Sequence, residues 1–154
     1  MKESWKEYKE RKEAQNYFRQ NNDQFLSSQQ WIKTILSCLV GALFLGVVHG
    51  AITMGIGIDF SILYIVIGYA LANIATSVSG VSSHQVALVS AVMTFLAFFI
   101  SRLTVYVIVY STFGISLSVI INMIPMTFMS MFQSGILDLI FIVIGVFVAY
   151  QQAQ

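Results

Sequence analysis

The apolar part of this chain contains few side chains that can carry charge or exchange a proton, and three of them, His49, Arg102 and Asp138, stand within long apolar runs. Ionisable residues in such runs usually face other helices rather than lipid. If the runs are membrane helices, all three residues lie toward the same end of the bundle, so we expect a polar cluster there. An Arg102–Asp138 ion pair that fixes helix register is its simplest role, and a substrate or proton site or no contact at all are the alternatives.

Other chemistry has little support in the sequence. Cys38, the single cysteine, lies in an apolar run and is expected to pack as a small residue. His84 falls at the opposite end of the predicted bundle from His49, so the two cannot share a metal ion. The sequence has no HExxH, CxxC or Walker motif. We therefore expect no catalytic, cofactor-binding or metal-binding residues and no enzymatic activity.

The distribution of charge predicts a membrane protein. Of 154 residues, 57% are hydrophobic and only 10% are charged, whereas a soluble domain carries about 25% charged residues. Seven of the eight Lys and Arg residues stand at or before Lys33, and the acids after that point are Asp59 and Asp138. The bilayer is therefore the expected partner, and the small net charge argues against nucleic acid.

The apolar runs predict an all-α fold, a polytopic integral membrane helical bundle over residues 31–154. Four transmembrane helices are expected at about 33–57, 61–78, 85–108 and 135–151. Residues 116–132 contain Asn122 and Pro125, and we expect an interfacial or re-entrant segment there rather than a fifth crossing. Residues 1–30 form a polar tail that is partly helical, either solvated or bound to the membrane interface or a partner.

Small residues recur on one face of each long run, where they allow helices to approach closely. The expected helix-packing residues are Gly46, Gly50, Gly68, Ala72 and Ala91. Gly46 and Gly50 form a GxxxG pair, which serves either packing within the chain or self-association. On the opposite face of 61–78, Ile67 and Leu71 are expected to face lipid.

The basic tail orients the predicted bundle. Lys and Arg are enriched on the cytoplasmic side of membrane proteins, so the N-terminus is expected in the cytoplasm. Four crossings return the C-terminus to the same side. Arg102 then lies at the outer end of its helix and Asp59 in an outer loop.

Three short segments carry a resemblance: Ile67–Ala70 (IGYA), Gln85–Leu88 (QVAL) and Gly145–Tyr150 (GVFVAY). They resemble segments of a family of small, uncharacterised four-span bacterial membrane proteins, and the similarity extends over residues 40–150. The resemblance implies a bacterial cytoplasmic membrane and no activity.

We therefore expect a non-enzymatic multi-pass membrane protein that acts as an accessory, immunity-type or partner-binding component. It would bind a protein partner, or a second copy of itself, through its small-residue stripes or its tail. The alternative is a small oligomeric transporter or channel that uses polar helix positions around Asn73, Thr94 and Asp138.

Overall fold

The fold is all-α, as predicted. A computed structural model describes residues 9–10, 26–57, 61–111, 114, 116–133 and 135–154, and this part of the chain contains no strand. The helices beyond the tail are α2 (Ser28–Ile56), α3 (Leu63–Ser79), α4 (His84–Ser111), α5 (Leu117–Gln133) and α6 (Ile136–Ala153). Lys9 and Glu10 are helical. The rest of the predicted tail up to residue 25, and Asp59, lie outside the described residues.

Local signals set the ends of two helices. The hydroxyl of Ser27 accepts a hydrogen bond from the Gln30 N–H, and the Gln30 side chain accepts one from the Ser27 N–H, so a capping box starts α2. Gly57 and Gly80 end α2 and α3 with φ values of 72° and 71°, a left-handed conformation that glycine adopts without steric cost. The capping box and Gly57 therefore define both ends of α2, and Gly80 defines the end of α3.

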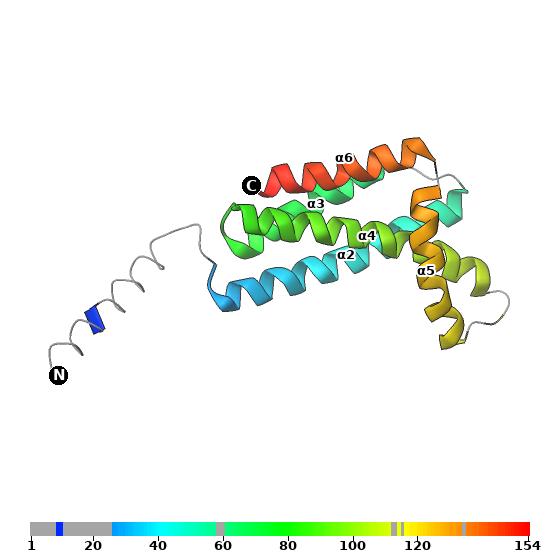
Figure 1. Cartoon of the computed structure of the whole chain (residues 1–154), viewed down its shortest axis with the longest axis horizontal. Coiled ribbons are helices and arrows are strands. Elements are labelled where there is room, and N and C mark those ends of the chain that lie inside the picture. Colours follow the sequence, from blue (N-terminus) through cyan, green and yellow to red (C-terminus); the bar gives the residue numbers. More distant parts are fainter. Residues whose placement is uncertain (1–8, 11–25, 58–60, 112–113, 115, 134) are drawn as a thin grey trace.

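Helices α2, α3, α4 and α6 lie side by side with roughly aligned axes, and α5 runs across them at one end (Figure 1). Contacts join α2 to α3 and α4, α6 to α3 and α4, and α3 to α4, whereas α5 packs mainly on α4. The start of α2, the end of α6 and the α3–α4 turn share the end of the bundle away from α5 (Figure 1).

Three helices, α2, α4 and α6, are long and apolar enough to span a membrane, while α3 and α5 are shorter apolar helices. At 1.5 Å per residue, the 29-residue α2 and 28-residue α4 are about 43 and 42 Å long. Both exceed the roughly 30 Å of hydrocarbon in a bilayer. Large apolar side chains cover their outer surfaces; Phe44, for example, is 67% exposed.

Glycines allow two close helix contacts. A Cβ atom on Gly46 would lie 2.6 Å from the Ala97 carbonyl oxygen, and one on Gly50 would lie 2.5 Å from that of Ser101, so α2 and α4 touch backbone to backbone. Gly68 lies against the Gly145 carbonyl in the same way, which joins α3 to α6. Both pairs of helices therefore depend on residues without side chains at their crossings.

The prediction that Ile67 and Leu71 face lipid is wrong. Their exposed fractions are 5% and 0%, and both belong to the main apolar core. Helix α3 contacts α2, α4 and α6, so its buried sector is wider than the small-residue stripe of Gly68 and Ala72. The exposed side of α3 carries Val66 and Tyr69 instead.

Ala91 lies in a different environment from the other expected packing residues. It is half-buried and lines an apolar groove of about 450 Å³ between α4 and α6. Met131 and Phe132, from the end of α5, also line this groove.

Candidate functional site

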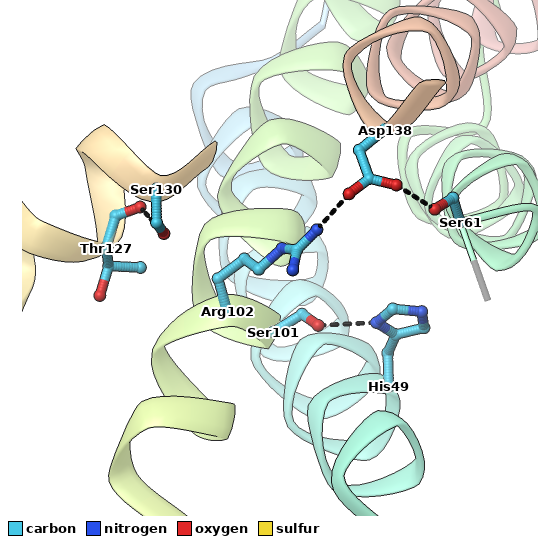
Figure 2. Close-up of polar contacts among 7 residues, drawn as sticks. All are labelled: His49, Ser61, Ser101, Arg102, Thr127, Ser130 and Asp138. Carbon is cyan, nitrogen blue, oxygen red and sulfur yellow. Dashed lines mark hydrogen bonds and ion pairs between the residues drawn. The ribbon is translucent and has the colours of Figure 1, made fainter. Parts of the chain in front are cut away.

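The polar cluster lies at the end of the bundle next to α5 and draws its residues from several helices. His49 comes from the last third of α2, Arg102 from the second half of α4, and Asp138 from the first turn of α6. Figure 2 shows the guanidinium of Arg102 pointing at Asp138, with Ser61 on the other side of the carboxylate. The site therefore depends on the packing of α2, α4 and α6 against one another.

Arg102 and Asp138 form an ion pair. Arg102 Nη2 donates to Asp138 Oδ2 over 2.9 Å, and the side chains are 20% and 18% exposed. Ser61 Oγ donates to the other carboxylate oxygen, Oδ1, over 2.5 Å. Asp138 also stands in the first turn of α6, where the helix dipole stabilises negative charge. Two donors and a helix start therefore hold this carboxylate in one orientation.

His49 joins the cluster through α4. Its Nδ1 shares a hydrogen bond of 2.6 Å with Ser101 Oγ, and only 3% of the residue is exposed. Its ring lies 4.9 Å from that of Tyr64, which in turn lies 4.5 Å from that of Phe98. Because Ser101 precedes Arg102, one turn of α4 positions both the histidine and the ion pair (Figure 2).

The sequence indicated three members of this site and missed Ser61, Tyr64 and Ser101. Ser101 stands on the small-residue face of its helix, where serine is as common for packing as for hydrogen bonding. Ser61 and Tyr64 flank the start of α3. Their position near the bundle end was visible in the sequence, but no spacing rule linked them to Asp138 or His49.

Beside the ion pair lies a small polar pocket of about 280 Å³ between α4 and α5. Its lining residues are Arg102, Val105, Tyr106, Ser130 and Gln133. The ion pair is therefore at the edge of a space that can admit a polar group.

Most polar side chains along the helices bond to their own helix. The hydroxyls of Thr34, Thr76, Thr94, Thr104 and Thr127 each donate to the carbonyl four residues earlier. The Asn73 amide donates to the Tyr69 carbonyl in the same way. Such bonds satisfy a hydroxyl or amide without a partner from another helix.

At the opposite end of the bundle, His84 and Tyr150 form a second polar contact. The Tyr150 hydroxyl and His84 Nδ1 are 2.6 Å apart, and the rings meet edge to face. This contact ties the start of α4 to the end of α6. Within the described ranges, no three His, Cys, Asp or Glu side chains come together as a group of metal ligands.

Comparison of the chain with protein-family models, curated proteins and solved structures finds no match. The resemblance of residues 40–150 to small four-span bacterial membrane proteins therefore stays a prediction.

Proposed function

We propose that this chain is a non-enzymatic, multi-pass protein of a bacterial cell membrane that acts by binding a protein partner, as an accessory or immunity-type component. In this proposal α2, α3, α4 and α6 cross the bilayer and both termini lie in the cytoplasm. Three of these helices are long and apolar enough to do so.

The fourth crossing is supported by the position of α3. Its 17 residues extend about 26 Å, close to the hydrocarbon thickness of a bilayer. It packs against α2, α4 and α6, so a bilayer around those three helices also surrounds α3. Helix α5, by contrast, runs across the bundle (Figure 1) and contains Pro125, as expected for an interfacial segment.

One observation carries the partner-binding proposal: Arg102 and Asp138 stabilise each other inside the fold. The Asp138 carboxylate is held by Arg102 and Ser61, which is the arrangement of an ion pair that fixes helix register. The apolar surfaces outside this network are broad and exposed. These surfaces and the polar tail offer the means to bind a partner within the membrane and in the cytoplasm.

The alternative, an oligomeric transporter or channel, needs polar side chains along a common path. Thr94 is fully buried and bonded to the Ser90 carbonyl. Asn73 is bonded to the Tyr69 carbonyl on the opposite, more exposed side of α3. Thr94 therefore lies inside the fold and Asn73 on the exposed side of α3, which favours the partner-binding proposal.

The test is purification of the tagged full-length chain from its native membrane in mild detergent. We expect a protein to co-purify in fixed ratio. Replacement of a large exposed side chain on the outer surface, as in Phe44→Ala, is expected to reduce its recovery. Purification of the chain alone, together with ion flux through it in proteoliposomes, would contradict the proposal and favour a channel.

A further inference from the structure

The outer side of α3 carries a regular row of residues that the packing of the bundle leaves uncovered. The row, called here the α3 seam, advances by alternating steps of four and three residues and consists of Ile62, Val66, Tyr69, Asn73 and Thr76. The first three are 61%, 58% and 51% exposed, and the last two are half-buried. Such steps keep side chains on one face of a helix, and this face is opposite the one that the bundle buries.

Asn73 is a polar member of this seam whose hydrogen bonds the fold leaves incomplete. Its amide donates to the Tyr69 carbonyl over 3.0 Å, which uses one of its two N–H groups. Its other N–H and its side-chain carbonyl oxygen have no hydrogen bond among the described residues. Asn73 lies about 15 Å from the start of α3 and about 9 Å from its end. In a bilayer it is therefore within the hydrocarbon, where an unpaired amide group is costly.

From this combination we propose that the α3 seam is a dimer interface, covered by α3 of a second copy of this chain in parallel and in register. The amide N–H of each Asn73 then donates to the side-chain carbonyl oxygen of the other. The inference rests on the crossing of the bilayer by α3 that is proposed above, but it does not depend on a separate protein partner.

The chemistry of Asn73 and the symmetry of a membrane select a second copy as the occupant. An acyl chain offers no hydrogen bond to the amide, so lipid alone leaves it unpaired. An amide both donates and accepts, which makes it complementary to itself. Copies that insert in the same orientation hold Asn73 at the same depth, and a twofold axis along the membrane normal brings the two amides together.

The spacing of the seam supports the same occupant. Alternating steps of four and three residues form the heptad pattern of a left-handed helix pair, and most helix pairs in membranes have this hand. In this pattern Val66 and Asn73 stand at a positions, and Ile62, Tyr69 and Thr76 stand at d positions. A single Asn at an a position fixes the register and the number of strands of a parallel coiled coil. The seam therefore has the pattern of two identical helices side by side.

The test is oxidative cross-linking of single cysteines in the native membrane, in the full-length chain with Cys38→Ser. Val66→Cys and Tyr69→Cys are expected to form a disulfide with a second copy. Val143→Cys and Phe147→Cys on α6 are the matched controls, because these side chains are 64% and 55% exposed and the contact of Gly68 with Gly145 places them at similar depth. The controls are expected to stay monomeric. Equal cross-linking at all four positions, or at none, would overturn the proposal.

Substitution of Asn73 tests the role of its amide. Asn73→Leu removes the amide at similar size and is expected to weaken dimerisation in mild detergent about tenfold, measured by analytical ultracentrifugation. Asn73→Gln keeps the amide and is expected to retain most of the affinity. Asn122→Leu makes the same chemical change at an exposed position of α5, away from the seam, and is expected to leave dimerisation unchanged.

The side chain of Asn73 bonds only to its own helix, so its variants are expected to fold, and the cross-linking decides the matter if one does not. Undiminished dimerisation in Asn73→Leu would overturn the pairing of the amides. A disulfide from Val66→Cys to a different protein, without a dimer, would overturn the choice of occupant. Failure to recover a separate protein partner leaves the cross-linking unaffected, so the two proposals can fail separately.

Discussion

At the scale of single residues, the Arg102–Asp138 pair combines a short contact with incomplete burial. About a fifth of each side chain is exposed, so the pair retains part of its hydration and avoids the full penalty of buried charge. Asp138 has a second donor in Ser61. Loss of one charge would therefore remove a favourable ionic contact from the other residue.

The ion pair leads to the first prediction. Arg102→Gln or Asp138→Asn alone is expected to reduce the free energy of unfolding by about 1–2 kcal/mol, because each removes the opposite charge that stabilises its partner in a mostly buried site. The double variant is expected to lose less than the sum, with a coupling energy of about 1 kcal/mol. Unfolding in detergent measures all four corners of the cycle, and strictly additive losses would show that the contact has no energetic role.

Two buried serines are expected to change the stability of the fold in opposite directions when each is replaced by alanine. Ser90 is fully buried, and its hydroxyl has no hydrogen-bond partner among the described residues, whereas the Ser79 hydroxyl donates to the Val81 carbonyl over 2.8 Å. Ser90→Ala is expected to stabilise the fold by about 1 kcal/mol and Ser79→Ala to destabilise it by about the same amount. Thermal unfolding of both variants checks this, and a loss in Ser90→Ala would mean that its hydroxyl has a partner.

At this scale, the sequence predicted the charges better than the uncharged polar contacts. Arg102 and Asp138 were the candidates for an ion pair because few charges follow Lys33. The bond between His49 and Ser101 was not predictable, because a serine on a small-residue face fits both packing and hydrogen bonding. Only the crossing of α2 and α4 at Gly50 brings that hydroxyl to the imidazole.

At the scale of helices, close backbone contact determines which substitutions the bundle tolerates. Gly68 on α3 lies against the Gly145 carbonyl of α6, and Gly145 lies against the Tyr64 carbonyl. A side chain at either position would force the two helices apart. The exposed neighbour Val66 points away from this contact, with 58% of its surface exposed.

The element-scale prediction compares these two positions on α3. Gly68→Leu is expected to destabilise the fold by more than about 3 kcal/mol or to prevent folding, because it overpacks a contact between backbones. Val66→Leu is expected to change stability by less than about 0.5 kcal/mol. Melting in detergent is the measurement, and similar losses in both variants would refute the assignment of the packed face.

The faces of α3 also show where sequence reasoning stops. A stripe of small residues predicts a contact with one neighbour, and Gly68, Ala72 and Ala75 are buried. The contacts of α3 with three other helices bury Ile67 and Leu71 as well. The number of neighbours is a property of the tertiary arrangement, and the periodicity of one helix does not contain it.

At the scale of the whole molecule, the bundle has two unlike ends. The end that holds Ser27, His84 and Tyr150 contains the capping box of α2 and the hydrogen bond between His84 and Tyr150. The other end carries the ion pair, the polar pocket and α5, which runs across the helices (Figure 1). The sequence predicted the helices and the unusual character of 116–132. The sequence did not predict that this segment packs on α4, because a helix that contains Asn122 and Pro125 can pack in several ways.

The central proposal is that the protein crosses the membrane four times, with both termini in the cytoplasm and α5 on the outer side. The most direct measurement is labelling of single cysteines in intact cells with a membrane-impermeant thiol reagent, in a Cys38→Ser background. Cysteines at Ser116 and Gln133, at the two ends of α5, are expected to react, whereas those at Ser82 and Gln152 react only after the membrane is permeabilised. Reaction of only one end of α5, or of Gln152 in intact cells, would contradict the account.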